Sequence, residues 1–384
     1  FKKLWKYINV SYDRFVRTTD DYHVKTVQDV FKTLYDKGYI YKGEYSGKYC
    51  KPCESFWTDS QLVDGKCPDC GREVVEAKEE AYFFKLSAFS DKLQNLLENS
   101  SFLEPRTRVN EMVNNFIKAG LEDLCVSRTS FKWGVPVSFD DKHVVYVWID
   151  ALSNYISALG YHNDTYSDFE KYWPADVHVM AKEIVRFHAL IWPAILMALD
   201  LPLPKKIYGH GWITFGDKKM SKSLGNVVLP QEVTKVYGAD VLRLWAASVD
   251  YRNDVKIGEN AIKQLVEIFK KIRNTSRFLL GNLFDFDPAK DYVEYKDLKA
   301  LDKFALHKLN TLISNVTEAF EDYEFYKYFQ QLQNFAAVDL SSFYLDIVKD
   351  RLYTAGKKSL SRRACQTVLY EISQALTRIL VPVM

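Results

Sequence analysis

The sequence of 384 residues lacks any hydrophobic run long enough to cross a lipid bilayer. Its most apolar candidate, residues 189–199, is too short, contains Pro193 and ends at Asp200. The N-terminus begins at Phe1 and soon turns basic and polar, so it does not have the pattern of a secretory signal peptide. It also lacks an initiator methionine, and the C-terminus stops at Met384 inside an apolar segment. We therefore interpret the chain as a fragment of a longer protein without a membrane partner.

A large excess of charge of one sign is also missing. The 52 Lys and Arg residues nearly balance the 50 Asp and Glu residues, which leaves a formal net charge of +2. This total gives no argument for binding nucleic acid, so an RNA partner would have to contact local basic surfaces. On charge alone, phosphate contact and an ordinary solvated helix face are equally expected for the two basic clusters, Lys270, Lys271, Arg273 and Arg277, and Lys357, Lys358, Arg362 and Arg363.

Cysteine is scarce, but four of the six cysteines form two pairs, Cys50-x-x-Cys53 and Cys67-x-x-Cys70. Such pairs are more often metal ligands than disulfides in a chain of this kind, and they indicate a reducing, cytoplasmic compartment. One tight turn presents both sulfurs of a pair to a metal, and two such turns supply the closed tetrahedral shell of a structural Zn²⁺ site. The alternative, a redox or disulfide pair, lacks the strand–helix–strand context of a thioredoxin-like motif.

The order of the predicted elements indicates an α/β half followed by a helical half. Residues 1–42 have helical periodicity, and a stretch rich in Gly, Cys and Pro follows at about 43–78. Strands are predicted at 144–148, 177–180 and 206–211, with helices from about 151 and over about 183–200. Strands alternating with helices favour a parallel sheet. From about residue 256 to the end, apolar residues keep helical spacing, which predicts a helical bundle.

Between the third predicted strand and the bundle, residues 219–223 read Lys-Met-Ser-Lys-Ser. Lysine ammonium groups suit phosphate, while serine hydroxyls and loop amides add hydrogen-bond donors. Such a loop can close over a triphosphate and stabilise charge as pyrophosphate leaves. An ordinary solvated basic turn has a similar composition, but a full five-residue match is rare by chance. The motif therefore predicts a loop that binds ATP phosphates.

This five-residue motif is a signature of class I aminoacyl-tRNA synthetases, and the chain resembles that family. Residues 1 to about 215 resemble bacterial methionyl-tRNA synthetase. The matching segments are residues 40–45, the two cysteine pairs, residues 120–128, 146–151 and 182–188, Trp192-Pro193, and residues 210–212. The resemblance implies a Rossmann-type catalytic domain with a zinc-knuckle insertion and a C-terminal all-α anticodon-binding domain.

The resemblance also implies a reaction and the residues that carry it. The amino-acid carboxylate attacks the α-phosphate of ATP bound with Mg²⁺, and the aminoacyl group then passes to tRNA. Lys219 and Lys222 are implied as catalytic. The residues implied at ATP are His210, Gly211, Lys219, Met220, Ser221, Lys222 and Ser223, and those implied at the methionine substrate are Trp148, Ala151, Tyr155, Glu183, Ile184 and His188.

Taken without the family, the substrate residues have simpler interpretations. Trp148 and Tyr155 are more readily interpreted as core aromatics, and His188 as a helix histidine with satisfied hydrogen bonds. Glu183 would be a favourable charge at a helix N-terminus. Large polarisable rings nevertheless suit a thioether, because they select methionine by shape and by sulfur–aromatic contact.

The chain departs from methionyl-tRNA synthetase in two places. The first family signature, a His-x-Gly-His turn that binds ATP, is absent, because the chain begins downstream of its expected position. From about residue 224 the sequence instead resembles isoleucyl-tRNA synthetase, through residues 237–245, 250–255, 271–275 and 339–344. Within the pocket, Leu152 stands where many relatives have Pro, and Ala181 where most have Gly.

Methionine is the favoured amino acid, because the catalytic half makes that choice. An isoleucyl enzyme normally carries a large editing insertion, since one methylene gives only about 1–3 kcal/mol of discrimination. The chain reaches its signature loop at Lys219, which leaves no room for one. Three alternatives stay open at this point: an isoleucine–tRNA ligase, a recombined methionine/isoleucine-type enzyme, and a catalytically inactive tRNA-binding fragment.

The sequence thus predicts four segments. Residues 1–140 hold the end of the first Rossmann half and a connective domain with the zinc knuckle at about 43–78. Residues 141–215 form the second Rossmann half, 216–255 the signature loop and a stem-contact region, and 256–384 the anticodon-binding bundle.

Overall fold

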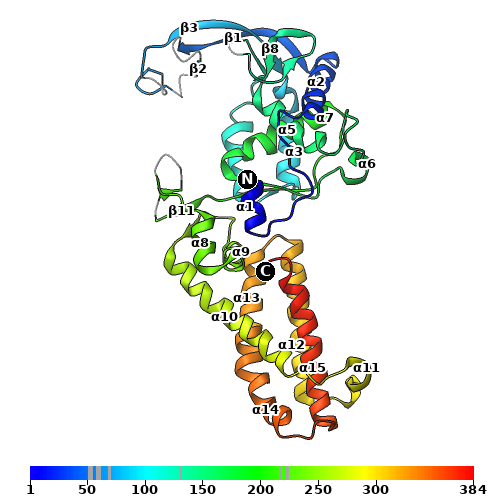
Figure 1. Ribbon diagram of the computed structural model, residues 1–384. Helices are drawn as coiled ribbons and strands as arrows, with labels where there is room; N and C mark the ends of the chain where they lie inside the picture. Colours follow the sequence, from blue (N-terminus) through cyan, green and yellow to red (C-terminus); the bar gives the residue numbers. More distant parts are fainter. Residues whose placement is uncertain (51–54, 58–61, 68–70, 130–131, 217, 221–224) are drawn as a thin grey trace. The chain divides into compact units, whose positions relative to one another are not determined.

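The computed structural model describes the chain except for residues 51–54, 58–61, 68–70, 130–131, 217 and 221–224 (Figure 1). The chain divides into two compact units. Unit 1 comprises Phe1–Ser11 and Gly211–Met384, and unit 2 comprises Tyr12–His210. Each unit has a hydrophobic core of its own, built around Trp192 in unit 2 and around Tyr328 and Tyr344 in unit 1. The division into four segments predicted from the sequence stays a prediction.

Unit 2 begins with a helix and a long antiparallel ribbon. Helix α2 spans Asp21–Asp36, and strand β1 (Ile40–Cys50) pairs with β3 (Val75–Phe84) from Ile40 opposite Phe84 to Tyr49 opposite Val75. The short strand β2 (Ser55–Trp57) pairs with the end of β1. The prediction that helical structure continues to residue 42 is therefore wrong. Gly38, with φ of +76°, reverses the chain after the helix, and the strand starts two residues later.

A parallel sheet lies at the centre of unit 2. Its strand order is β4 (Leu103–Glu104), β10 (Ile207–His210) and β9 (His178–Ala181). Between β9 and β10 the chain forms a short 3-10 turn, η4 (Lys182–Ile184), a π-helical turn, η5 (Phe187–Ile191), and α7 (Trp192–Ala198). Two of the three strands predicted from the sequence lie in this sheet, and the predicted helix between them is present in these three pieces.

The third predicted strand, residues 144–148, is placed differently. Strand β8 (Asp140–Val145) belongs to a small antiparallel sheet with β6 (Ser127–Arg128) and β7 (Pro136–Val137). Helix α5 already begins at Val147, because Tyr146 is its extended N-cap residue. The buried residues Ile149, Leu152 and Ile156 show the helical spacing that follows. A short β-branched and aromatic run is compatible with a strand and with a helix. Here residues 144 and 145 end the strand, and residues 147 and 148 begin the helix.

The other described elements of unit 2 are helices and helical turns, and one further short strand that pairs with β3 at the edge of the ribbon. They are η2 (Leu86–Phe89), α3 (Ser90–Asn99), α4 (Arg106–Met112), η3 (Val113–Ile117), β5 (Leu124–Cys125) and α6 (Phe169–Tyr172). Helix α2 packs against α5, so the ribbon and the residues of α5 share one core.

Unit 1 contains a small sheet and a helical bundle. The sheet has the order β12 (Lys218–Lys219), β11 (Ile213–Phe215) and β13 (Val255–Ile257). Helices α1 (Lys2–Tyr7), α8 (Pro230–Tyr237) and α9 (Ala239–Ser248) belong to the same unit. The bundle confirms the predicted change to helical structure after residue 256. Its elements are α10 (Glu259–Gly281), α11 (Pro288–Asp291), η7 (Tyr295–Asp297), α12 (Ala300–Glu321), α13 (Phe325–Asn334), η8 (Phe335–Tyr344), α14 (Leu345–Tyr353) and α15 (Leu360–Leu380).

Buried polar contacts join the bundle helices. Asp302 of α12 is fully buried and accepts hydrogen bonds from the Tyr344 hydroxyl at 2.9 Å and from both terminal nitrogens of Arg351 at 2.8 and 2.7 Å. Figure 1 shows α12 and α15 running side by side, in agreement with their packing. A buried carboxylate needs such a partner, since an unpaired charge in this position would be costly.

Arg243 of α9 joins three distant parts of unit 1. Its guanidinium donates hydrogen bonds to the carbonyl oxygen of Asn9 at 2.8 Å and to that of Val383 at 2.7 Å. A longer bond of 3.2 Å reaches the carbonyl of Pro382. Residues 1–11 are thus held against a helix that lies far away in sequence. Among the described residues, the longest apolar helices fall short of what a membrane span requires.

Candidate functional site

The predicted substrate residues come together in unit 2, on α5 and the helical turns after β9. Trp148, Ala151 and Tyr155 follow one another at three- and four-residue intervals, which places them on one face of α5. Ile184 and His188 lie on η4 and η5. All five are buried or half-buried, whereas Glu183 is exposed. The structure therefore groups the residues that the sequence proposed for an apolar amino-acid side chain.

His188 has hydrogen bonds at both ring nitrogens. Its Nδ1 lies 2.9 Å from the carbonyl oxygen of Ile184, and its Nε2 lies 2.9 Å from the hydroxyl of Tyr155. A carbonyl oxygen can only accept, so Nδ1 carries the proton and Nε2 accepts from Tyr155. Burial lowers the pKa of His188 and raises the pKa of Tyr155 to about 12. Both groups are therefore neutral near pH 7, and the pair presents no net charge.

The structure adds aromatic residues that the sequence did not assign to the site. Phe187 stacks on Trp148 with ring centroids 3.6 Å apart and planes 10° from parallel. His178 of β9 lies with its ring centroid 3.9 Å from that of Tyr155. Trp192 directs its ring nitrogen toward His178 Nε2 at 3.4 Å. In the sequence, Phe187, His178 and Trp192 were marked only by lying close to the predicted substrate residues or within a segment that matches the family.

The local helix geometry explains why Phe187 and His188 both belong to this cluster. Residues Phe187–Ile191 form a π-helical turn, which spreads consecutive side chains differently from an α-helix. Such single turns inside helices are frequent at functional sites. Burial, and secondarily the nearby His188, lowers the pKa of His178 to about 3. The cluster is thus a largely buried, neutral and strongly aromatic environment, which suits a polarisable apolar side chain.

Two of the residues predicted to bind ATP lie at the end of β10. His210 is the last residue of β10 and is opposite Ala181 in the parallel register with β9. Gly211 follows it as the first residue of unit 1's second segment. A Cβ at Gly211 would come within 2.1 Å of the carbonyl oxygen of Asn253, so only glycine fits this close approach of two backbones.

The Lys-Met-Ser-Lys-Ser motif begins in the second strand of a β-hairpin in unit 1. Lys218 and Lys219 form β12, which pairs antiparallel with β11, and Met220 N–H donates to the carbonyl of Ile213 at 3.1 Å. The sulfur of Met220 lies 3.1 Å from the Val228 amide nitrogen. The lysine–serine loop therefore starts from a strand edge. Ser221, Lys222 and Ser223 lie outside the described residues, and for Lys219 the backbone alone is described.

The predicted metal ligands are described only in part. Cys50 is the last residue of β1, and Cys67 lies in the segment between β2 and β3. Both side chains are buried. The Gly71 amide donates to the carbonyl of Cys67 at 2.8 Å, with Gly71 at φ of +68°. A hydrogen bond between these two described residues is compatible with the tight turn that a cysteine pair needs in order to share a metal. Cys53 and Cys70 lie outside the described residues.

A second group of metal-ligand types, Glu80, Asp140 and His143, has a different role. Their donor atoms lie within 4.8 Å of one another. The Nζ of Lys42 already lies 2.8 Å from Glu80 and 3.1 Å from Asp140. The hydrogen bond from Lys42 is the first cause that lowers the pKa of Glu80. An ammonium group at this position opposes a second cation, so this cluster is an ion-pair network.

Comparison with known proteins shows the relationship of the chain. The family described as tRNA synthetases class I (M) matches residues 1–78 and 72–275, and the anticodon-binding domain of tRNA ligase matches residues 302–384. A methionine–tRNA ligase of Clostridium perfringens is 56% identical over 283 residues, which cover 73% of this chain and 43% of that protein. A methionine–tRNA ligase of Caldanaerobacter subterraneus is 57% identical over the same length and the same shares.

Solved structures agree with these matches. A methionyl-tRNA synthetase from Mycobacterium tuberculosis, in complex with methionyl-adenylate, superposes with a TM-score of 0.83 at 31% identity. The match covers 100% of this chain and 77% of that one. The chain spans less than half the length of the curated relatives it matches. The isoleucyl-type resemblance predicted after residue 224 is absent from these matches, which name the anticodon-binding domain only in general terms. By both sequence and structure, the chain belongs to the class I tRNA synthetases, in the family described as class I (M).

Proposed function

We propose that this chain is the methionine-activating part of a methionine–tRNA ligase. In this reaction the methionine carboxylate attacks the α-phosphate of Mg²⁺-bound ATP, pyrophosphate leaves, and the methionyl group then passes from the adenylate to tRNA. The observation that carries the proposal is the cluster of Trp148, Tyr155, Phe187 and His188. The curated relatives and the Mycobacterium tuberculosis structure support it by their names.

The cluster suits the methionine side chain for physical reasons. The stacked rings of Trp148 and Phe187 offer a polarisable surface, and sulfur–aromatic contacts contribute about 0.3–1.5 kcal/mol each. In the neutral pair of Tyr155 and His188, the hydroxyl proton of Tyr155, the Nδ1 proton of His188 and the Nε2 acceptor are already used. A polar side chain placed there would lose its hydration and find no free donor in this pair, so the site favours a thioether over polar amino acids. We assign Ala151 and Ile184 to the same pocket, and Glu183 to its exposed rim.

We assign ATP to the residues around the lysine–serine motif. Lys219 and Lys222 would stabilise the negative charge that grows on the pyrophosphate, since lysine is a mobile point charge suited to phosphate. His210, Gly211, Met220, Ser221 and Ser223 complete the proposed ATP contacts. The short β12–β11 hairpin supports this assignment, because it gives the motif a fixed starting point next to a strand.

Amino-acid-dependent exchange of pyrophosphate into ATP by the full-length protein tests the proposal. We expect exchange with methionine and little with isoleucine. Lys222→Ala should slow adenylate formation by about a hundredfold or more, because it removes a charge that acts on the leaving group, while the melting temperature stays unchanged. Exchange with isoleucine alone would contradict the choice of amino acid. A wild-type protein with no exchange but tight tRNA binding would instead favour an inactive tRNA-binding fragment.

The tRNA partner is a separate question, because the sequence led us to expect an isoleucyl-type region after about residue 224, in the segments 237–245, 250–255, 271–275 and 339–344, and the comparisons do not show it. We propose tRNA specific for methionine, in keeping with the amino acid. Charging purified methionine and isoleucine tRNAs with methionine distinguishes the two. Preferential charging of the isoleucine tRNA would support the recombined enzyme.

We also propose that Cys50, Cys53, Cys67 and Cys70 hold a structural Zn²⁺ ion. Two buried cysteines and the turn closed by Gly71 support this donor set. A closed four-thiolate shell would tie the tip of the β1–β3 ribbon together. The purified protein should contain about one zinc per chain, and Cys67→Ser should lose it, whereas Cys125→Ser should keep it. Cys125 and Cys365 are buried thiols without a disulfide, which supports a cytoplasmic location.

A further inference from the structure

Residues 250–254 form a loop that is bonded directly to the strand leading into the lysine hairpin. The Gly211 amide donates to the carbonyl of Tyr251 at 2.8 Å, and the Trp212 amide donates to the Asp254 carboxylate at 2.9 Å. The Val255 amide donates back to the carbonyl of Trp212 at 2.8 Å. Three successive bonds therefore hold residues 211 and 212 to this loop.

The contact between the two segments is close as well as hydrogen-bonded. A Cβ at Gly211 would lie 2.3 Å from the Asn253 carbonyl carbon and 2.6 Å from the Asp254 amide nitrogen. Backbone atoms cannot move aside as a flexible side chain can, so the position of Gly211 is set by the loop. Asp254 adds a charge-assisted bond at the next residue, which is stronger than a neutral one.

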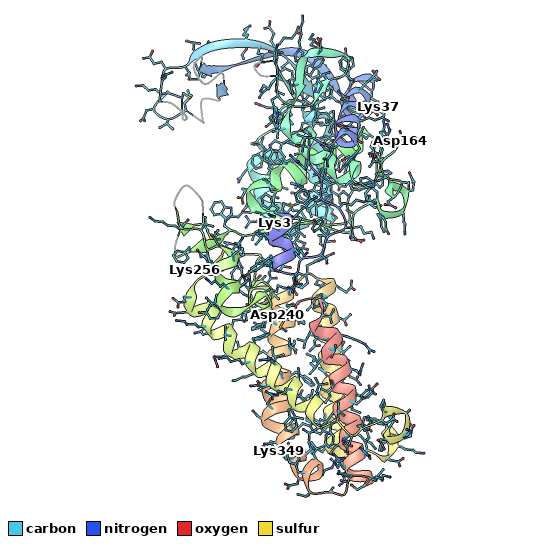
Figure 2. The ribbon with its side chains drawn as sticks, viewed as in Figure 1. Lys3, Lys37, Asp164, Asp240, Lys256 and Lys349 are labelled. Atoms are coloured by element: carbon cyan, nitrogen blue, oxygen red, sulfur yellow. The ribbon has the colours of Figure 1, made fainter. Side chains whose placement is uncertain are left out.

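The small sheet carries this constraint to the hairpin. Strand β11 lies between β13 and β12, with Ile213 opposite Val255, Phe215 opposite Ile257, and Thr214 opposite both Lys256 and Lys219. Figure 2 labels Lys256 on β13, the strand that continues directly from Asp254. Because the pairing is continuous, a shift of the 250–254 loop moves β11, and with it the backbone of Lys218 and Lys219.

The opposite side of the loop is fixed to the turn between α12 and α13. Arg252 bonds to Asp250 at 2.8 and 2.9 Å, to the Glu324 carboxylate at 2.9 Å and to the Tyr326 hydroxyl at 2.8 Å. The Tyr251 hydroxyl also donates to the carbonyl of Tyr323. Arg252 is half-buried among these acceptors, and its side chain is the first cause that lowers the pKa of Asp250.

We propose that Asp254 and Arg252 are positioning residues for adenylate formation: they fix the β11–β12 hairpin so that Lys219 starts from a defined place. Asp254 acts on the strand through the Trp212 amide, and Arg252 holds the loop against the α12–α13 turn. Neither side chain needs to touch a substrate. This inference rests on the proposed function of the lysine–serine motif as an ATP-binding loop.

Asp254→Ala in the full-length protein tests the inference, with Asp254→Asn as the conservative variant. The alanine variant loses the acceptor for Trp212, and we expect kcat/KM for ATP in pyrophosphate exchange to fall about tenfold or more. The methionine KM should stay within about twofold, because the methionine cluster lies on α5 and η5. Asparagine keeps an oxygen acceptor, so Asp254→Asn should recover most of the lost activity.

Arg252→Gln should lower the same ATP parameter, since it removes the contacts to Glu324. Asp297→Ala is the matched control, because Asp297 is an exposed aspartate of the same unit with no side-chain hydrogen bond among those described. We expect that control to keep wild-type kinetics. Equal losses for ATP and methionine, or equal losses in Asp254→Ala and Asp254→Asn, would overturn the positioning role.

Hydrogen exchange of the amides of residues 211–220 separates this inference from the proposed function. In Asp254→Ala these amides should exchange about tenfold faster than in the wild type, while those of α15 stay unchanged. Unchanged exchange at 211–220 would overturn the inference whether or not the protein activates methionine. Faster hydrogen exchange at 211–220 in Asp254→Ala, together with a wild-type protein that activates no amino acid, would count against the proposed function instead.

Discussion

Tyr155→Phe removes one oxygen atom from the centre of the aromatic cluster and leaves the ring in place. The wild-type hydroxyl donates to Nε2 of His188 at 2.9 Å, and His188 is 3% exposed. The Nδ1 proton is already committed to the carbonyl of Ile184. In the variant, Nε2 becomes a buried acceptor without a donor.

The expected cost follows from that geometry. A buried acceptor that loses its partner costs about 1–3 kcal/mol of folding free energy. In a unit of this size, 1 kcal/mol corresponds to about 2–4 °C in melting temperature, so the shift should be about 2–12 °C. Methionine should bind less well because His188 is no longer oriented, and we expect kcat/KM for methionine to fall by up to about tenfold. The KM for ATP should not change.

Thermal unfolding and pyrophosphate exchange measure the two effects. Tyr161→Phe is the control, since Tyr161 is half-buried and its hydroxyl has no hydrogen bond among those described. That variant should stay within about 0.5 kcal/mol of the wild type. The pKa of Tyr155, raised to about 12 by burial, also predicts a methionine KM that is flat between about pH 7 and 9. A Tyr155→Phe protein as stable and as active as the wild type would refute the hydrogen-bonded role of this pair.

Three further predictions concern stability. Burial lowers the pKa of His178 to about 3, below its unfolded value near 6.5, so the unfolded state binds the extra proton and stability falls as pH drops below about 6.5. Between pH 7.5 and 5, urea unfolding should show that the wild type loses about 2 kcal/mol more of its free energy of unfolding than His178→Phe does. The same dependence of the unfolding free energy on pH in both proteins would contradict this. The hydrogen bond from Arg362 lowers the pKa of Asp285 to about 2, so its contribution is complete above about pH 4 and disappears as pH falls toward 2. Asp285→Asn should cost about 2 kcal/mol at pH 7 and nothing near pH 2, as followed by circular dichroism. Gly209→Ala brings a Cβ within 2.4 Å of Val185 in the core and should cost about 1–3 kcal/mol, whereas Gly281→Ala, with open space around it, should be neutral or stabilising.

The sequence predicted those parts of the fold that follow from periodicity and from strong motifs. The apolar spacing after residue 256 predicted the bundle, and the strands at 177–180 and 206–211 were found in the parallel sheet. The run 144–148 could not be assigned from pattern alone, because β-branched and aromatic residues fit both a strand and the first turn of a helix. The N-cap at Tyr146 decides between them, and it depends on tertiary contacts.

The grouping of side chains in the candidate site could be predicted where the family resemblance proposed the residues, and not beyond; their roles stay predictions. Trp148, Tyr155 and His188 were proposed from the resemblance, and the structure brings them together. Phe187 joins them through a π-helical turn, which has no reliable sequence signature. The hydrogen bond from the Trp212 amide to the Asp254 carboxylate links two residues that are 42 positions apart in the sequence. No local pattern encodes such a contact, because it depends on the pairing of two distant strands.

The contacts of Arg243 have a consequence for the order in which the molecule is made. The carbonyls of Asn9 and Val383 share this one guanidinium, so the first and last parts of the chain complete the same unit. A ribosome releases residues 12–210 long before Val383 appears, and that continuous unit has its own core from which to fold. Residues 1–11 can reach Arg243 only after the helical unit has been synthesised. We therefore expect the helical unit to form after residues 12–210 have folded, and residues 1–11 to join it only once Val383 has left the ribosome.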